Sequence, residues 1–272
     1  MKKESIGYVI PTLNSEKTLD QTLSSLLNQA NLNIDIIVVD SGSVDQTLTI
    51  CNKWGVKSLY AEPGNMYSAI NLGISQLHNE WVGYINSDDY IYSDSAYRLI
   101  QAGNDQNSDI VYGVCDYIDF QGRLMYSFSP PLPQNLKSTT KVGPVGFAQQ
   151  TAIFRRKVFL ELNGFNEEYR YCADKDFFAR AIKENYKFSF LPNPSVACFR
   201  LHKNQFSQSR QSEMNEESIG ISTSIFGNQT LWDKFIFYKW RTSNLPYYLL
   251  RVLRCSLLSN KIEIKKSMSS LD

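Results

Sequence analysis

The sequence predicts an α/β protein in which a mainly parallel sheet is flanked by helices. Over the first ninety residues, short apolar runs alternate with amphipathic stretches, as in a chain that winds from strand to helix to strand. The apolar runs are too continuous to leave one face wet, so a parallel sheet covered on both sides is expected. From about residue 211 the alternation gives way to a helical pattern. We therefore expect an α/β domain followed by a helical C-terminal extension.

The first strands and helices follow from the spacing of apolar side chains. After the apolar run at 6–10, Leu19, Leu23, Leu26 and Leu27 recur at the spacing of one helix face. Further strands are expected at 34–40, 57–60 and 81–86, with helices between them at 43–51 and 66–77. Parallel strands connected in this way have their carboxyl ends along one edge of the sheet, where ligands bind.

The second part of the chain has a different pattern. In the segment 109–128, two strands joined through Gln121 and Gly122 predict an antiparallel hairpin. Three prolines, Pro130, Pro131 and Pro133, predict that an irregular loop follows it. Further helices are expected at 155–162, before Gly164, and at 173–186, with a late strand at 195–202.

Composition and charge limit the classes of partner. The chain has 272 residues and a net charge of +1, from 28 basic and 27 acidic side chains, so no nucleic-acid partner is expected. From residue 231 onward, however, eight basic residues face three acidic ones, so the extension is basic. Five scattered cysteines without a CxxC pair fit a reducing compartment. Because no apolar stretch approaches a membrane span or a signal peptide, a cytoplasmic protein is expected.

Several familiar ligand motifs of α/β sheets are missing from the sequence. The turn after the first strand, "PTLNSEKT", has no glycine, which argues against a dinucleotide-binding loop. Neither a P-loop nor a GxSxG nucleophile elbow occurs. Acidic residues at strand ends remain: Asp40 ends the second strand, and Asp88 and Asp89 follow the fourth. Two adjacent carboxylates at the end of a buried strand indicate a metal or ligand site, or alternatively a solvated turn.

Six segments occur in the order found in one known family. They are "VIPTLNSEKTLDQTLSSLLNQ", "IIVVDSGSVDQT", "EPGNMYSAINLGI", "YINSDDYI", "GFNEEYRYCADKDFFARAI" and "FRLHKNQFS". Over roughly residues 5–210 the chain resembles the family 2 glycosyltransferases of the GT-A fold, and especially bacterial enzymes of surface-polysaccharide synthesis. The resemblance implies a Rossmann-like GT-A domain at 1–210, with a nucleotide-binding half (1–90) and an acceptor-binding half (91–210). The segment 211–272 would be the helical, basic extension.

The resemblance assigns a metal site to the paired carboxylates. Asp89 would bind a divalent cation, and Asp88 would contact the ribose or a metal-bound water. A hard cation held by carboxylate oxygens would stabilise the charge on a departing nucleoside diphosphate. The family pattern also implies that His202 approaches the metal or the diphosphate, and an imidazole ligand favours Mn2+ over Mg2+. The alternative for His202 is a structural hydrogen bond.

The same resemblance implies a nucleotide site at the ends of the first, second and fourth strands. It would be formed by Pro11, Thr12, Asn14, Asp40, Ser87 and Asp88. A carboxylate that accepts a hydrogen bond from a uracil N–H would select the base, because a wrong base would leave the buried acceptor unpaired. In the alternative, Asp40 merely caps the following turn and helix.

Catalytic and sugar-binding roles are also implied by the resemblance. Asp174 matches the family's general base, which takes the proton of the acceptor hydroxyl. Asp176 lies two residues on and points to the opposite side of the helix, so only one of the two can act. The alternative is that both are acids favoured by the helix dipole. Gln149 and Gln150 match positions that line the donor-sugar or acceptor pocket, where amides suit sugar hydroxyls.

Together these features predict a metal-dependent inverting glycosyltransferase of hexosyltransferase type, with Mn2+ or Mg2+ as cofactor. The donor would be a nucleotide sugar, UDP-linked, and the acceptor a saccharide or lipid-linked saccharide. The alternative is a non-catalytic, nucleotide-sugar-binding subunit of a glycan-assembly complex. The aromatic and basic residues of 229–260 indicate either contact with the inner face of the plasma membrane or a homodimer.

Overall fold

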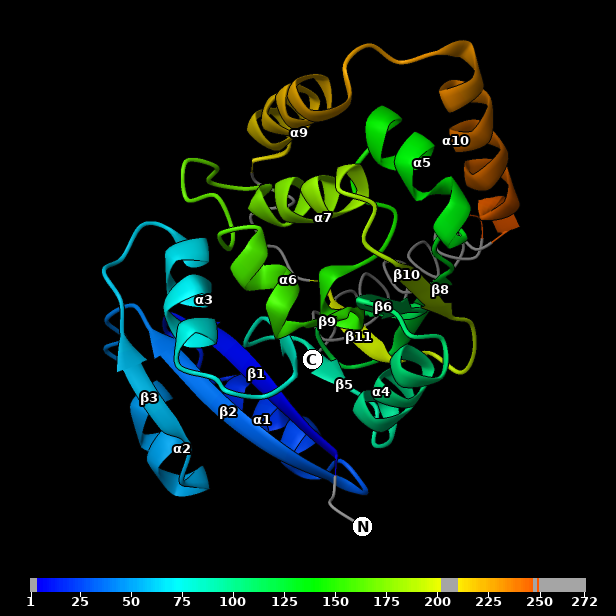
Figure 1. Cartoon of the computed structure of the whole chain (residues 1–272). Coiled ribbons are helices and arrows are strands. Elements are labelled where there is room, and N and C mark those ends of the chain that lie inside the picture. Colours follow the sequence, from blue (N-terminus) through cyan, green and yellow to red (C-terminus); the bar gives the residue numbers. More distant parts are fainter. Residues whose placement is uncertain (1–3, 202–209, 247–248, 250–272) are drawn as a thin grey trace, which may run out of the picture.

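Two sheets organise the part of the chain that the computed structural model describes, residues 4–201, 210–246 and 249 (Figure 1). The larger sheet has the strand order β10-β6-β9-β4-β1-β2-β3. Its strands are β1 (Glu4–Thr12), β2 (Leu32–Asp40), β3 (Lys57–Tyr60), β4 (Trp81–Tyr84), β6 (Ile110–Gly113), β9 (Ile153–Arg155) and β10 (Phe188–Leu191). The pairs β1–β2, β1–β4, β2–β3 and β6–β10 are parallel, and only β9 runs antiparallel to its neighbours among these described strands. The expected mainly parallel sheet is confirmed.

A smaller sheet with the order β5-β11-β7-β8 lies beside the larger one. It contains β5 (Tyr90–Ile91), β7 (Cys115–Ile118), β8 (Leu124–Phe128) and β11 (Ala197–Arg200). The pair β7–β8 forms the turn end of the hairpin predicted at 109–128, but the predicted first strand is divided, and β6 joins the larger sheet instead. Gly122 in the turn has the left-handed φ of 81° that glycine adopts without strain. Because β11 pairs with β5, the late strand is held directly beside the acidic loop that follows β4.

Helices cover both faces of the larger sheet because successive residues of its strands point to opposite sides. On β1, Val9 packs with α3, α6 and α7, whereas Tyr8 and Ile10 pack with α1, α2 and α4. These helices are α1 (Leu19–Leu27), α2 (Thr47–Trp54), α3 (Met66–Ser75), α4 (Ser95–Asp105), α6 (Arg156–Glu161) and α7 (Ala173–Lys183). On α1, Leu19, Leu23 and Leu26 are fully buried as predicted, whereas Leu27 is 38% exposed.

The loop after the three prolines contains a helix that the sequence did not predict. A short 3-10 turn, η1 (Pro133–Asn135), leads into α5 (Leu136–Val142). The C-terminal helices predicted from the sequence are α9 (Gln211–Phe226) and α10 (Leu231–Ser243). Helix α9 packs on α7 and α5, and α10 packs on α5 (Figure 1). Among the described residues, no helix combines the length and apolar character needed to cross a membrane.

Candidate active site

The carboxyl ends of β1, β2 and β4 meet at one edge of the larger sheet. In the parallel register of β1 and β2, Thr12 is the partner of Asp40, so the last residues of the two strands are adjacent. On the other side of β1, β4 ends at Tyr84 and continues into the segment 85–89. The fold therefore brings together the segments on which the predicted nucleotide and metal residues lie.

Asp40 is held by the turn that follows β2. Its Oδ2 accepts hydrogen bonds from the backbone N–H groups of Gly42 (3.0 Å) and Ser43 (2.9 Å). Its Oδ1 accepts from the hydroxyl of Ser43 and from Thr12 Oγ1 at 3.2 Å. This geometry favours the alternative in which Asp40 stabilises the turn. Direct contact with a base would require one of these hydrogen bonds to be exchanged.

The loop after β1 is tied to the loops after β2 and β4. The backbone N–H of Asn14 donates to Ser43 Oγ at 2.8 Å, and Asn14 Oδ1 accepts from the N–H of Val44 at 3.0 Å. The hydroxyls of Ser15 and Ser87 are 2.7 Å apart. Pro11 is buried in β1 just before Thr12. The predicted nucleotide residues thus lie at the ends of β1 and β2 and in the loops after β1 and β4, which hydrogen bonds join into one surface.

The acidic loop 86–89 is fixed from two sides. From α1, Thr22 Oγ1 lies 2.9 Å from the carbonyl oxygen of Ser87 and 2.7 Å from that of Asp89. From β11, Arg200 donates its backbone N–H to Asp89 Oδ1 at 2.9 Å and its Nε–H to the carbonyl oxygen of Asp88 at 2.9 Å. Arg200 was not predicted as a site residue. The sequence feature that could have indicated Arg200 is a basic residue inside a buried strand. Only the pairing of β11 with β5 shows that Arg200 contacts the acidic loop.

Asp89 is buried and only partly hydrogen-bonded. Its side chain is 1% exposed, and Oδ2 has no hydrogen-bond partner among the described residues. Burial, and next the charge of Asp88, raise the pKa of Asp89 well above its ordinary value. A buried carboxylate oxygen without a partner, adjacent to a second carboxylate, fits a divalent cation ligand. Within the described ranges, no group of three or more His, Cys, Asp or Glu residues gathers around a metal position.

His202, the predicted third metal residue, lies outside the described residues. The described chain reaches Leu201, whose N–H donates to the carbonyl oxygen of Ile118 at 2.8 Å. Leu201 directly follows Arg200, which contacts Asp88 and Asp89. The role of His202 therefore stays a prediction.

Asp174 lies in the first turn of α7, and its charge acts on the residue that ends β4. Its Oδ1 accepts from the N–H of Lys175 at 2.8 Å and lies 3.2 Å from the hydroxyl of buried Tyr67. Burial raises the pKa of Asp174, although these two hydrogen bonds act in the opposite direction. Burial, followed by the nearby charge of Asp174, raises the pKa of Tyr84, the last residue of β4. Tyr84 shares a core cluster with Tyr67 and Ala173, the neighbours of Asp174.

The environment of Asp176 differs from that of Asp174, in agreement with the expectation that the two side chains point to opposite sides of the helix. Its carboxylate accepts from Arg180 at 2.7 Å, and its side chain is 6% exposed. Arg180 also donates to the carbonyl oxygens of Leu162 and Gly164. Asp176 is therefore part of the packing between α6 and α7, and of the two acids Asp174 is better suited to act as a base.

Helix α9 holds the segment that leads into Asp174. The carboxylate of Glu217 accepts hydrogen bonds from three successive backbone N–H groups, those of Arg170 (2.6 Å), Tyr171 (2.8 Å) and Cys172 (2.8 Å). Buried Lys175 donates from Nζ to the carbonyl oxygen of Ser218 at 2.6 Å, and burial lowers its pKa to about 8. Sequence reasoning missed Glu217, because a cap supplied from 45 residues away leaves no local pattern.

Gln149 and Gln150 lie in a 3-10 turn, η2 (Gln149–Thr151), which contacts β4, β5, β6 and β11. The Nε2 and Oε1 atoms of Gln149 are both buried and without a hydrogen-bond partner in the described ranges. Gln150 is 2% exposed, and its Nε2 lies 3.7 Å from the sulfur of Cys115. Buried amide atoms without partners are costly, so the environment of Gln149 fits a group that a polar ligand completes.

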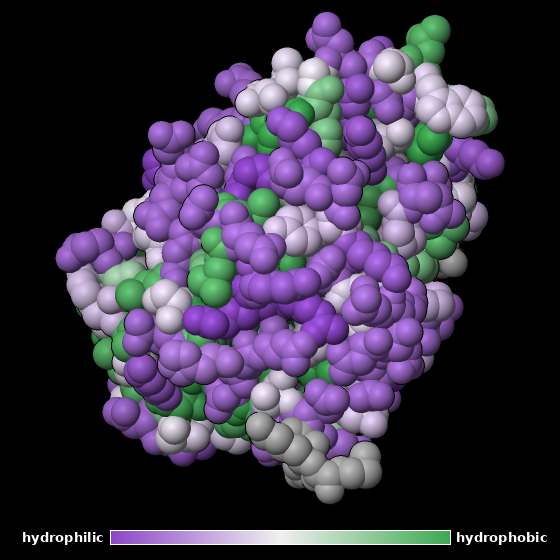
Figure 2. All heavy atoms as spheres, viewed as in Figure 1, coloured by the Kyte–Doolittle hydropathy of each residue, from purple (hydrophilic) through white to green (hydrophobic). Residues whose placement is uncertain are grey.

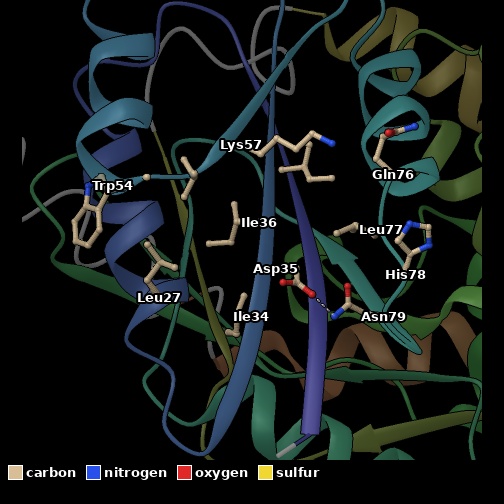
Figure 3. Close-up of a pocket in the computed structure, with 13 residues that line it drawn as sticks. Leu27, Ile34, Asp35, Ile36, Trp54, Lys57, Gln76, Leu77, His78 and Asn79 are labelled. Carbon is tan, nitrogen blue, oxygen red and sulfur yellow. Dashed lines mark hydrogen bonds between the residues drawn. The ribbon is translucent and has the colours of Figure 1, made fainter.

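Figure 3 shows a hollow at the opposite edge of the larger sheet. It surrounds the amino-terminal half of β2, where Asp35 accepts a hydrogen bond from Asn79 at 2.7 Å. Its lining includes Leu27, Trp54 and the exposed His78, but none of the predicted site residues. The hollow is therefore separate from the candidate active site.

Comparisons with known proteins identify the family and the fold of this chain. Residues 8–162 match the model of the family described as glycosyl transferase family 2. The chain belongs to this family, and its fold is of the GT-A type. An uncharacterized glycosyltransferase of Rickettsia typhi is 27% identical over 187 residues, 65% of this chain and 58% of that protein. The chain thus spans little more than half the length of that relative.

Other similar proteins have more specific descriptions. A PGL/p-HBAD biosynthesis glycosyltransferase of Mycobacterium bovis is 28% identical over 190 residues, 67% of this chain and 71% of that protein. The structure of S. aureus TarS 1-349 in complex with UDP-GlcNAc superposes with a TM-score of 0.64 at 19% identity, covering 89% of this chain and 73% of that one. The mannosyltransferase PcManGT from Pyrobaculum calidifontis, in complex with GDP-Man and Mn2+, superposes with a TM-score of 0.58 at 13% identity, covering 97% and 87%.

Proposed function

We propose that this chain is a metal-dependent inverting glycosyltransferase that moves a sugar from a UDP-linked donor to an acceptor hydroxyl. The observation that carries the proposal is the arrangement at the end of β4. Two adjacent carboxylates, Asp88 and Asp89, follow this strand, and Oδ2 of Asp89 is buried without a hydrogen-bond partner among the described residues. A third carboxylate, Asp174, lies in the first turn of α7 and accepts a hydrogen bond from Tyr67 of α3. A transfer reaction of this class needs both kinds of group, one for the leaving diphosphate and one for the attacking hydroxyl.

The donor would bind along the three joined loops. Thr12, Asn14 and Asp40 would shape the nucleoside site, and Ser87 and Asp88 the side nearer the phosphates. The hydrogen bonds that connect these loops support the assignment, because they hold the surface in place before a ligand binds. The solved complex of TarS with UDP-GlcNAc also supports a UDP-linked donor, although GDP-Man is bound in PcManGT.

A divalent cation, Mn2+ or Mg2+, would be held by Asp89 together with Asp88, and His202 would be a further ligand. It would stabilise the negative charge that develops on the departing diphosphate. The unpartnered Oδ2 of Asp89 is the described atom that best fits this role. Arg200 would keep the carboxylate in place, since its backbone N–H binds the other oxygen, Oδ1.

Asp174 would act as the general base. Both hydrogen bonds from Tyr67 and Lys175 go to Oδ1, so Oδ2 is the oxygen that would receive the acceptor proton. As that proton moves to Asp174, the acceptor oxygen would bond to the anomeric carbon. The bond from this carbon to the diphosphate oxygen breaks with its electron pair, through a transition state of oxocarbenium character. A single displacement of this kind inverts the anomeric configuration.

The remaining assignments concern the acceptor and the cell. We propose that residues 1–90 bind the donor, 91–210 the acceptor, and 211–272 form an extension. The unpartnered amide of Gln149 would contact a sugar, with Gln150 beside it. A saccharide or lipid-linked saccharide of surface-polysaccharide synthesis would be the acceptor, on the cytoplasmic side of the plasma membrane. The non-catalytic alternative is disfavoured because a binding subunit has no need of the base at Asp174.

Hydrolysis of the donor, with water in place of the acceptor, tests this proposal without a known acceptor. The chain would be incubated with Mn2+ and with UDP-glucose or UDP-GlcNAc, both α-linked, while proton NMR follows the first sugar released. Inversion predicts that the β anomer appears first and mutarotates later. Initial release of the α anomer would contradict the inverting mechanism. Turnover of GDP-mannose but of neither UDP-sugar would contradict the donor assignment.

A further inference from the structure

The outward face of α10 is an exposed apolar and aromatic surface. Leu231 is 86% exposed, Trp232 65%, Phe235 54% and Tyr238 61%. The rings of Trp232 and Phe235 stack with their centroids 5.3 Å apart. Figure 2 shows green and pale side chains among purple ones at the upper right of the molecule, where Figure 1 has α10. Large apolar side chains gathered on one exposed helix face indicate an interaction surface.

The opposite face of α10 is already packed, so the rotation of the helix is fixed. Trp240 donates its indole N–H to the carbonyl oxygen of Ser129 at 3.1 Å and packs edge-on against Phe128. Asp233 forms an ion pair with Lys141 at 3.0 Å and completes a capping box with Thr230. The exposed aromatic face is therefore not the side that this helix uses to fold onto the domain.

The charges on the exposed face all have one sign. Lys234, Lys239 and Arg241 are exposed, whereas Asp233, the only acid in α10, is buried. At about 100° per residue, Leu231, Phe235 and Tyr238 form a stripe with Lys239 on one side and Lys234 and Arg241 on the other. Beyond the end of α10, the described residues Leu245 and Leu249 are also exposed, at 51% and 56%.

The sequence left two partners for residues 229–260, a membrane or a second copy of the chain. Within this segment, residues 247–248 and 250–260 lie outside the described ranges. We propose that the outward face of α10 binds the surface of an anionic lipid bilayer. Indole, phenol and leucine side chains enter the headgroup region, and flanking lysines extend to the lipid phosphates. A second copy is the poorer occupant, because two such faces would bring like charges together without an exposed acid on either helix. This proposal goes beyond the proposed function, since it holds for any acceptor.

Vesicle sedimentation of the full chain tests the proposal. The vesicles would contain phosphatidylcholine alone or with about 30 mol % phosphatidylglycerol. Binding is expected only to the anionic vesicles and should weaken as salt is raised. The double variants Trp232→Ser with Phe235→Ser, and Lys234→Glu with Lys239→Glu, should each reduce the vesicle-bound fraction about tenfold or more. Leu160 of α6 is 51% exposed, close to the 54% of Phe235, so Leu160→Ser is the matched control and should bind vesicles like the wild type.

Three outcomes would overturn the proposal. Either double variant could bind like the wild type, or neutral and anionic vesicles could bind equally well. The third outcome is a concentration-dependent dimer, lost in the Trp232/Phe235 variant, with no vesicle binding, which would assign the face to a second copy. The variants lie outside the catalytic and binding residues, so they should retain the wild-type melting temperature and donor hydrolysis rate. Donor hydrolysis therefore reports on the proposed function separately.

Discussion

Replacement of Asp174 by asparagine is expected to remove activity without loss of stability. Both hydrogen bonds to the carboxylate go to Oδ1, and an asparagine Oδ1 can accept the same two from Tyr67 and Lys175. What disappears is the group that accepts the acceptor proton. Loss of a general base costs about 10²–10⁴ in rate, and donor hydrolysis should fall within that range while donor affinity stays unchanged.

The stability of this variant follows from the direction of the pKa shift. Burial raises the pKa of Asp174 in the folded chain. A raised folded pKa favours folding below the ordinary aspartate pKa, and this contribution is lost as pH rises through the folded value. Above that folded value, the ionised carboxylate therefore lowers the free energy of unfolding. The Asp174→Asn substitution removes that charge, so the melting temperature should be equal to or higher than that of the wild type.

Asp176→Asn is the matched control for Asp174→Asn, because both acids lie in the first turn of α7. Burial raises the pKa of Asp176 as well, but Asp176, unlike Asp174, pairs with a charged partner, Arg180. The substitution leaves that guanidinium without its carboxylate and should reduce the free energy of unfolding by about 1.5–3 kcal/mol. Its rate per folded molecule should stay close to wild type. Urea unfolding and donor hydrolysis measure the two effects. Asp174 is not the general base if Asp174→Asn hydrolyses the donor at the wild-type rate. The same conclusion follows if Asp176→Asn loses donor hydrolysis while its free energy of unfolding is unchanged.

Three further predictions concern the same site. The rate of donor hydrolysis should rise with pH through an apparent pKa above that of an ordinary aspartate, and a pH profile with no such acidic limb would contradict this. Glu217→Gln should lower kcat more than it raises the donor KM, because it weakens the cap on the segment before Asp174; unchanged steady-state kinetics would exclude a positioning role. Gln149→Leu should reduce the discrimination between UDP-GlcNAc and UDP-glucose, measured as the ratio of their hydrolysis rates, by about tenfold. An unchanged ratio would show that Gln149 does not contact the donor sugar.

Local patterns predicted β1 to β4 and the helices between them, but not β9 and β10 of the same sheet. Leu19, Leu23 and Leu26 of α1 and the apolar runs of β1, β2 and β4 lie in the core because spacing decides which side chains can share a face. Helix α5 was missed because prolines dominate the sequence before it. It begins only after the 3-10 turn that Pro133 starts. Its position depends on packing against α7, α9 and α10, which no local pattern records.

The sequence indicated the candidate residues that would act on a ligand directly. It did not indicate the distant residues that hold those candidates in position. Asp88 and Asp89 were selected from their types and their place after a buried strand, and Asp174 from the family resemblance; their roles stay predictions. Arg200 and Glu217 were not selected, because each acts on a segment more than 40 residues away through contacts that only the fold creates. The position of Asp40 at a strand end also did not reveal that its carboxylate stabilises the following turn. It accepts four hydrogen bonds, from Thr12, Gly42 and Ser43.

Thermal unfolding with nucleotides tests whether Asp89 holds a metal ion that a nucleoside diphosphate needs for binding. Wild type, Asp89→Asn and the control Asp105→Asn, an exposed acid at the end of α4, would be melted with UDP or GDP, with and without Mn2+. Asparagine at 89 can still accept from the Arg200 N–H, so the fold should be kept. We expect UDP to stabilise the wild type and the control by about 2.7 kcal/mol at a hundred times its Kd, only with Mn2+, and we expect Asp89→Asn to lose this stabilisation. Equal stabilisation of Asp89→Asn and wild type, or no response to either nucleotide at millimolar concentration, would contradict this expectation.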